Sequence, residues 1–162
     1  MFTREEQKNV LIESLKFCQE KKGLEIYGFC IMSNHLHMIC KAINEITLPD
    51  IMRDLKKYTS KKITKTILDE PESRRIWMLN YFENVSKHLK KDQKYKVWQN
   101  EYYAEVIYSN KFLLQKLNYI HNNPVRAGIV DQPEHYLYSS ARNYAGLEEK
   151  LEVILIDILS AN

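Results

Sequence analysis

Two histidines separated by one residue, His35 and His37, form the clearest metal-binding pattern in the chain. On a strand, residues two apart project from the same face, so the two imidazoles would lie side by side. Imidazole is a good ligand for manganese, zinc and related divalent ions, and two of them leave positions open for a third protein ligand and a phosphate oxygen. An isolated H-x-H pair is more often two hydrogen-bonded residues at a strand end, so the pattern needs support from elsewhere in the chain.

The second pattern surrounds Tyr119, in a segment with helical spacing. Residues four apart on a helix lie one turn above each other, so Tyr119 and Asn123 share a side, with Lys116 one turn earlier. A half-buried tyrosine with a satisfied hydroxyl is an equally good interpretation, because the chain has 11 tyrosines. His121 is poorly placed to help Tyr119, since two positions correspond to about 200° round a helix. An adjacent apolar stripe would anchor the helix: Leu113, Leu117 and Ile120.

A third pattern is a run of cations with Tyr58 among them, in which Asp54 is the single acid between Arg53 and Lys65. A charge run is usually a solvated helix face. Because this run lacks balancing acids, a nucleic-acid backbone is a reasonable partner. The cations are Arg53, Lys56, Lys57, Lys61, Lys62 and Lys65.

Apolar spacing and turn residues predict the elements that must position these groups. Thr3 with Glu6 resembles a capping box for a first helix, which Gly23 ends, and Pro124 ends the helix that carries Tyr119. Within the second helix, Tyr58 is expected to face inward. The expected helices cover residues 4–22, 49–68, 73–91 and 109–122. The expected strands cover residues 24–42, 102–108 and 151–156. The first of these is expected as an interior strand, covered on both faces, with a break at 33–34.

The composition is that of a soluble globular protein, with 162 residues, 44% hydrophobic and 28% charged, and we expect residues 1–162 to form a single domain. Its three cysteines are odd in number and form no C-x-x-C pair, which favours a reducing cytosol. With neither a secretory leader nor a membrane-length apolar run, we expect a cytoplasmic protein without membrane contact. A net charge of +3 is too mild by itself to indicate a nucleic-acid binder.

Taken together, these motifs resemble a known family. The segment Y-G-F-C-I-M-S-N-H-L-H-M-I-C, from Tyr27 to Cys40, resembles the M-x-N-H-x-H strand of the single-tyrosine HUH transposases, a group of IS200-like transposases. The segments Y-I-H-N-N-P-V-R-A-G-I-V, from Tyr119, and Y-L-Y-S-S-A-R-N-Y, from Tyr136, resemble the branch associated with repetitive extragenic palindromes (REP). The similarity extends over nearly the whole chain.

The resemblance implies an α+β fold: a ferredoxin-like antiparallel sheet, with the histidines on a central strand and helices packed on it. It implies that His35, His37 and Asn123 bind Mg²⁺ or Mn²⁺ and that Tyr119 is the nucleophile. The implied activity is cutting and rejoining of single-stranded or hairpin DNA through a 5′-phosphotyrosine, with Lys116 as a hypothetical contributor to an ionised phenol. The residues expected to contact DNA are Arg53, Lys56, Lys57, Lys61, Lys62, Lys116, Arg126 and Arg142.

One departure from the family concerns the first strand. Relatives normally have a strand before the segment that matches residues 2–4, so we expect this strand to be lacking and a sheet edge to be exposed. A truncated chain, a strand borrowed from a partner and a decayed copy are three explanations. The alternative function is therefore a catalytically inactive DNA-binding protein that retains the fold. A metal hydrolase ranks lower, since no H-E-x-x-H is present. The sequence leaves open whether Tyr119 serves its own chain or the partner in a homodimer.

Overall fold

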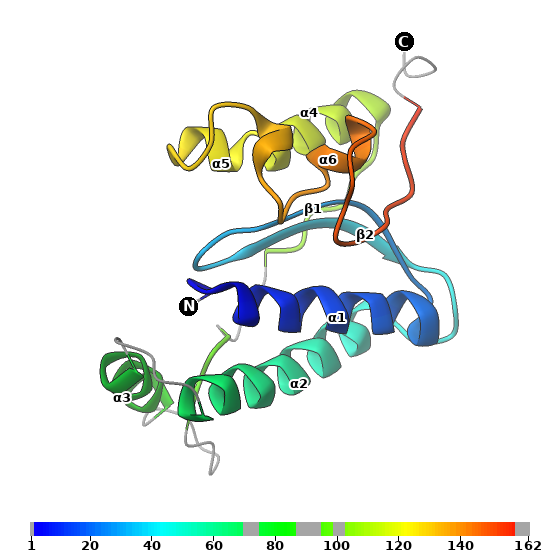
Figure 1. The fold of residues 1–162 in the computed structure, drawn as a ribbon. Helices are drawn as coiled ribbons and strands as arrows, with labels where there is room; N and C mark the ends of the chain where they lie inside the picture. The colour runs from blue at the N-terminus through cyan, green and yellow to red at the C-terminus, as the bar shows by residue number, and fades with distance from the viewer. Residues whose placement is uncertain (1, 70–74, 87–94, 99–102, 158–162) are drawn as a thin grey trace.

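The structure, a computed structural model, describes residues 2–69, 75–86, 95–98 and 103–157. A β-hairpin forms the middle layer, with α1 and α2 on one side of it and α4, α5 and α6 on the other (Figure 1). The elements are α1 (Glu5–Lys22), β1 (Leu24–Ile31), β2 (Leu36–Ala42), α2 (Leu48–Asp69), α3 (Arg75–Ser86), α4 (Asn110–His121), α5 (Asn123–Arg126), the 3₁₀ helix η1 (Pro133–His135) and α6 (Ala141–Tyr144).

The first helix, α1, follows the predicted range closely but starts differently. The start of the helix is capped by the side-chain carbonyl of Gln7 and not by a Thr3–Glu6 pair. This carbonyl accepts hydrogen bonds from the backbone N–H of Thr3 at 2.9 Å and from that of Arg4 at 3.4 Å. The predicted capping box is therefore wrong by one residue. Gly23 ends the helix as predicted, because its φ of 67° lies in the left-handed region that favours glycine.

Residues 24–42, expected as one interior strand with a break, form two antiparallel strands, and the break at Ser33–Asn34 is the turn between them. The backbone N–H of Met32 donates to the carbonyl of His35 at 2.9 Å and closes this turn. Cys30 on β1 pairs with His37 on β2. Helices cover both faces of the hairpin, as the mixed apolar pattern predicted (Figure 1).

The two outer edges of the hairpin differ. The edge of β1 is covered by later parts of the chain, through 2.9 Å backbone hydrogen bonds that join Ile31 to Tyr138, Phe29 to Ser140 and Ile26 to Ile154. Within the described residues, β2 pairs with β1 alone.

The expected ferredoxin-like sheet is therefore represented by two strands in the described part of the chain. The strands predicted at 102–108 and 151–156 are wrong where described: residues 103–108 and 151–156 belong to no strand. Their β-type composition does not supply a partner for the backbone, which a strand requires. Residue 102 lies outside the described residues.

The second helix, α2, turns one side to α1 and the core. The predicted inward position of Tyr58 is wrong, since its side chain is exposed and Thr59 is buried instead. The Thr59 hydroxyl donates to the carbonyl of Leu55 at 2.7 Å and accepts from the indole N–H of Trp98 at 2.8 Å. The third helix, α3, buries Met78 and Phe82; residues 73–74 and 87–91 of its predicted range lie outside the described residues.

Candidate active site

The structure brings the paired histidines and the tyrosine together on one side of the hairpin. The ring centroids of His35 and His37 are 4.6 Å apart, and that of Tyr119 on α4 is 5.6 Å from that of His37. The two contacts are edge-on, with interplanar angles of 78° and 81°. His35 directly precedes β2, His37 lies on it and Tyr119 lies on α4, so segments far apart in the sequence meet here.

The position of Tyr119 depends on how α4 is held. Ser109 caps its start, as predicted, by accepting a hydrogen bond from the N–H of Phe112 at 3.2 Å. Leu117 and Ile120 of the predicted apolar stripe are buried. The helix lies so close to β1 that a β-carbon added at Gly28 would stand 2.6 Å from the Leu117 Cδ1 atom. The absence of a β-carbon at Gly28 therefore allows α4 to approach the hairpin this closely.

A buried polar contact fixes the end of α4. The Nε2 atom of His121 lies 2.8 Å from the Ser140 hydroxyl, which also accepts from the backbone N–H of Phe29 at 2.8 Å. Burial lowers the pKa of His121 from 6.5 to about 4, so this imidazole is neutral at pH 7. The Tyr136–Tyr144 segment thus joins α4 to β1. Neither His121 nor Ser140 was assigned this role from the sequence, although both lie in the motifs that carry the family resemblance.

The two site histidines are in the form that binds metals. Burial lowers the pKa of His35, and burial together with the nearby His35 lowers that of His37. Both rings are therefore neutral at pH 7, as metal coordination requires. The Nδ1 atom of His35 is 2.6 Å from the side-chain oxygen of Asn34. That oxygen can only accept, so Nδ1 carries the proton and Nε2 keeps its lone pair. This orienting role of Asn34 was missed from the sequence.

Asn123, the expected third ligand, begins α5 one turn beyond Tyr119. The backbone remains nearly helical across Asn122, and Pro124 lies within this new turn rather than simply ending α4 as predicted. The Asn123 Nδ2 atom is buried and has no hydrogen-bond partner among the described residues. A buried amide group without a hydrogen-bond partner destabilises the folded state. Rotating the Asn123 side-chain amide by 180° would place its carbonyl oxygen, a possible metal ligand, at the position of Nδ2.

The cation beside Tyr119 is not the one that the sequence favoured. The Arg126 guanidinium lies 5.3 Å from the centre of the Tyr119 ring. Lys116 is instead paired with Glu105 and lies over the Phe112 ring. The turn at α5 thus carries Arg126, rather than Lys116, back over the Tyr119 ring.

Arg142 is held by backbone carbonyls. Its guanidinium donates to the carbonyl of Glu148 at 2.6 Å and to that of Glu134 at 2.9 Å. These bonds fasten the loops that flank α6, so its side chain is less available to DNA than the sequence analysis expected.

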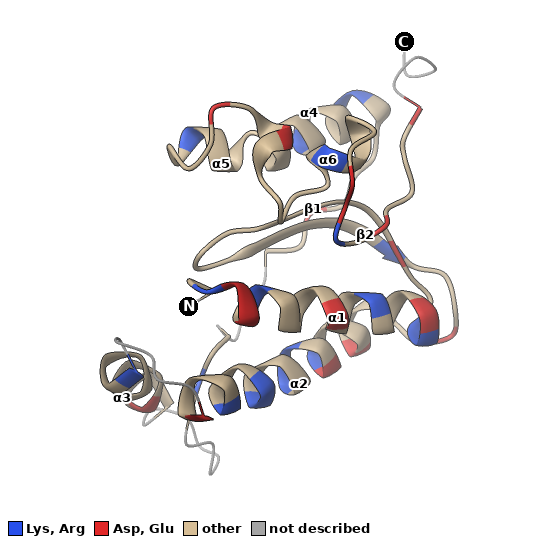
Figure 2. Ribbon diagram, viewed as in Figure 1, with Lys and Arg blue, Asp and Glu red and all other residues tan. Residues whose placement is uncertain are grey.

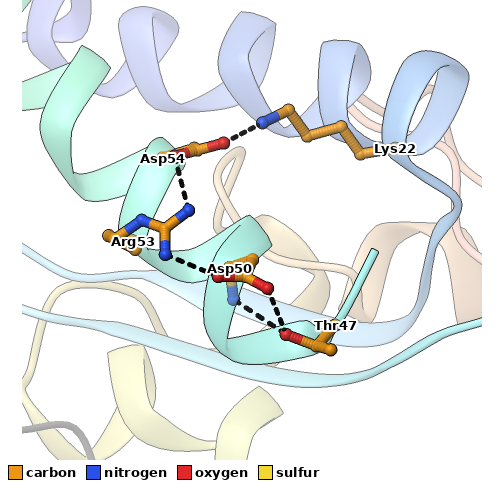
Figure 3. Close-up of polar contacts among 5 residues, drawn as sticks. All are labelled: Lys22, Thr47, Asp50, Arg53 and Asp54. Atoms are coloured by element: carbon orange, nitrogen blue, oxygen red, sulfur yellow. Dashed lines mark hydrogen bonds and ion pairs between the residues drawn. The ribbon is translucent and has the colours of Figure 1, made fainter. Parts of the chain in front are cut away.

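The remaining predicted DNA contacts lie on α2, on the opposite side of the hairpin from Tyr119 (Figure 2). Arg53 is neutralised there by Asp50 at 2.5 Å and Asp54 at 3.5 Å, and Asp54 also meets Lys22 of α1 at 2.5 Å (Figure 3). The Lys62 ammonium lies 5.9 Å from the centre of the Tyr58 ring. The cations predicted to bind DNA are thus divided between two faces of the molecule.

A metal at the candidate site would need a ligand beyond His35 and His37, and Asn123 is the expected one. Among the described residues, no group of three or more His, Cys, Asp and Glu side chains is arranged to hold a metal ion. Two imidazoles with an amide oxygen fit the preferences of a divalent cation, and Mg²⁺ or Mn²⁺ also accepts phosphate oxygens. Separately, none of the described helices is both long and apolar enough to span a membrane.

The fold is similar to that of a known transposase. Over 96% of its length the chain matches a solved REP-associated tyrosine transposase bound to a REP hairpin, with a TM-score of 0.61, 19% sequence identity and 79% of that chain covered. At this identity, the likeness establishes the α+β fold alone.

The family is established by sequence. The family model described as "Transposase IS200 like" matches residues 1–85, more than half of the chain. The chain therefore belongs to the IS200-like transposases, a family of DNA transposases. The match includes His35 and His37, whereas Tyr119 and Asn123 lie beyond it. A search of curated proteins gave no match.

Proposed function

We propose that this protein is a metal-dependent DNA transesterase that cuts and rejoins single-stranded or hairpin DNA through a 5′-phosphotyrosine at Tyr119. The observation that carries the proposal is the 5.6 Å separation between the Tyr119 and His37 rings within one chain. A phenol beside two neutral imidazoles is suited to attack a phosphate held by a metal on those imidazoles. The DNA hairpin bound to the structurally similar transposase supports the choice of substrate.

Tyr119 is accessible to a DNA strand, with 44% of its side chain exposed. In the proposed reaction its oxygen bonds to phosphorus while the bond from phosphorus to the 3′-oxygen breaks. The 3′-oxygen leaves with the electron pair and takes up a proton, and the phenol proton passes to solvent. The phosphotyrosine conserves the bond energy, so the reverse attack by a 3′-hydroxyl rejoins the strand without a nucleotide cofactor. Arg126 is placed to hold a phosphate oxygen beside the ring.

His35, His37 and Asn123 are the proposed ligands of Mg²⁺ or Mn²⁺, in line with the use of divalent metals in the family. When bound, the ion would polarise the scissile phosphate and orient it for in-line attack. The chain contributes the neutral state of both imidazoles, the Asn34 contact that orients His35, and the unpartnered amide of Asn123. Each feature supports a ligand role.

The test is formation of a covalent protein–DNA adduct, detected as a band that resists denaturing electrophoresis. The full chain is incubated with a labelled pool of hairpins that carry randomised single-stranded flanks, with Mg²⁺, Mn²⁺ or EDTA. We expect a metal-dependent adduct that Tyr119→Phe abolishes. The matched control is Tyr103→Phe, since the Tyr103 side chain is 98% exposed and lies outside the site.

Two results would count against the proposal. An adduct that forms as readily with Tyr119→Phe removes the nucleophile assignment. Salt-sensitive hairpin binding that ignores EDTA and never yields an adduct favours a DNA-binding protein that retains the fold without cutting.

A further inference from the structure

The solvent face of α2 carries a row of three lysines. Lys57, Lys61 and Lys65 are four residues apart, so they lie above one another on one side of the helix. All three are exposed, and within the described residues the structure gives none of them an ion pair. By contrast, the acids near Arg53 neutralise the start of the helix (Figure 3). Among the described residues, the cations of α2 that have no ion pair therefore lie along its later turns, ahead of Asp69 at its end.

Two aromatic rings lie exposed on α3, the helix that follows. Trp77 and Tyr81 are 65% and 54% exposed, and their rings are stacked with centroids 5.8 Å apart and an interplanar angle of 18°. Met78 and Phe82, about 100° round the helix from the ring pair, are the α3 side chains buried in the core. The Tyr81 ring contacts that of Phe82 at 6.2 Å but remains largely exposed. Large exposed apolar groups of this kind mark interaction sites. α3 packs near the C-terminal end of α2, toward which the lysine row runs (Figure 2).

We propose that Lys57, Lys61, Lys65, Trp77 and Tyr81 form a second nucleic-acid site, the α2–α3 surface, which binds single-stranded DNA. Lysines that neutralise phosphates beside aromatic rings that stack on bases are the two components of sequence-tolerant single-strand binding. The surface lies on the opposite side of the hairpin from Tyr119 (Figure 1). This inference rests on the proposed function only in taking DNA as the ligand.

The ring pair selects unpaired bases over a duplex. Bases in a duplex are stacked on each other and present only their edges in the grooves, whereas a single strand can place a base face on an aromatic ring. The nearly parallel Trp77 and Tyr81 rings offer such a face on α3, a helix that contacts α2. A protein partner would use the exposed apolar area without requiring bases, which the test below distinguishes.

The test compares two labelled oligonucleotides, each of about 20 nucleotides so as to exceed one binding site. One is oligo(dT), and the other has the same backbone with abasic sugars. Fluorescence anisotropy measures binding in EDTA with Tyr119→Phe protein, so that cleavage cannot contribute. We expect Trp77→Ala/Tyr81→Ala to weaken oligo(dT) binding by about ten-fold or more and to leave abasic binding unchanged. Trp77→Phe should retain most of the binding, and Ile76→Ala, which alters an exposed aliphatic neighbour, is the matched control.

The lysine row is tested by its salt dependence. Replacing Lys57, Lys61 and Lys65 by glutamine should reduce the slope of log K against log salt by about 2 for both oligonucleotides, at roughly 0.7 for each phosphate that is no longer neutralised. Lys21→Gln, an exposed lysine on α1, should leave the slope unchanged.

Several outcomes would overturn the inference. Equal losses on oligo(dT) and abasic DNA, or no loss on either, show that the rings bind no bases. Self-association in sedimentation that the ring variant removes, with oligo(dT) binding intact, assigns the rings to a second copy of the chain. The adduct assay separates this inference from the proposed function: ring-dependent binding without any adduct refutes only the chemistry, and an adduct without ring-dependent binding refutes only the second site.

Discussion

Substitution of Gly28 tests the packing that places Tyr119. Gly28 has no left-handed backbone, so alanine would ordinarily stabilise the protein by about 0.4–1 kcal/mol, because it restricts the unfolded chain. Here its β-carbon would stand 2.6 Å from Leu117 Cδ1. A relaxed carbon contact is about 3.5 Å or more, so the two atoms must separate by roughly 1 Å.

The destabilisation caused by this crowding should exceed the stabilisation that alanine gives by restricting the unfolded chain. Overpacking of a filled core costs about 1–3 kcal/mol, so we expect Gly28→Ala to lower the free energy of unfolding by about 0.5–2 kcal/mol. The displaced atom is the end of a side chain that is only 2% exposed, and it has little free space to enter. If α4 moves instead, Tyr119 moves with it, and adduct formation should fall further than stability alone explains.

A double-mutant cycle measured by urea unfolding checks this explanation. Leu117→Ala alone should cost about 2–5 kcal/mol, because it leaves a cavity. In the Gly28→Ala background it should cost less, since it removes the crowding methyl, with a coupling energy of about 0.5–3 kcal/mol. A stabilising Gly28→Ala that adds to Leu117→Ala without coupling would refute the close approach of α4 to β1.

Three further predictions concern acidity, thiols and the cation at the tyrosine. The pKa of His121 is lowered from 6.5 in the unfolded chain to about 4 in the folded protein, so the unfolded state binds its proton first as the pH falls. The free energy of unfolding, measured in EDTA, should therefore fall by about 3 kcal/mol between these two pKa values, and His121→Gln should make this pH dependence shallower. Burial raises the pKa of Cys30 to about 12 and that of Cys40 to about 11, so thiol reagents at pH 8 should label both slowly until denaturant is added. Arg126→Gln should slow adduct formation by about 10- to 100-fold, and Lys116→Gln by less than about three-fold, because Lys116 is already paired; equal rates for the two variants would remove the role of Arg126.

Local chemistry made part of the fold predictable from the sequence. Gly23 ends α1 because it alone accepts a left-handed backbone cheaply, and Ser109 caps α4 through its own hydroxyl. The interruption at Ser33–Asn34 marked the turn of the hairpin. Each of these features depends on residues a few positions apart, which the sequence displays directly.

Features that depend on distant partners were not predictable in this way. Residues 103–108 have the composition of a strand, yet whether they pair depends on a neighbour that composition does not specify. Thr59 replaces Tyr58 in the core because its hydroxyl finds both the helix backbone and Trp98. Apolar spacing alone had predicted that the larger Tyr58 side chain would face the core.

The candidate site shows the same division. His35 and His37 could be paired from their spacing, and Asn123 placed one turn from Tyr119. The approach of Arg126 to the Tyr119 ring follows from the turn at α5, which the sequence analysis treated as the end of the helix. The contact of His121 with Ser140 joins residues 19 apart and becomes visible only when the C-terminal segment lies on β1.

The hairpin separates the lysine row on α2 from Tyr119, so one DNA strand that uses both must pass around it. The edge of β1 is covered by residues 138–140 and 154, whereas the hairpin turn beside His35 lies at the same end of the molecule as α3 (Figure 1). A single-stranded flank on a hairpin substrate would therefore reach the Trp77–Tyr81 rings around this turn, and only above a threshold length. We expect adduct formation at limiting DNA to rise when the flank exceeds that threshold, and Trp77→Ala/Tyr81→Ala to abolish the rise while leaving short-flank substrates unaffected. A rise of equal size in the ring variant would mean that the α2–α3 surface and Tyr119 do not engage the same strand.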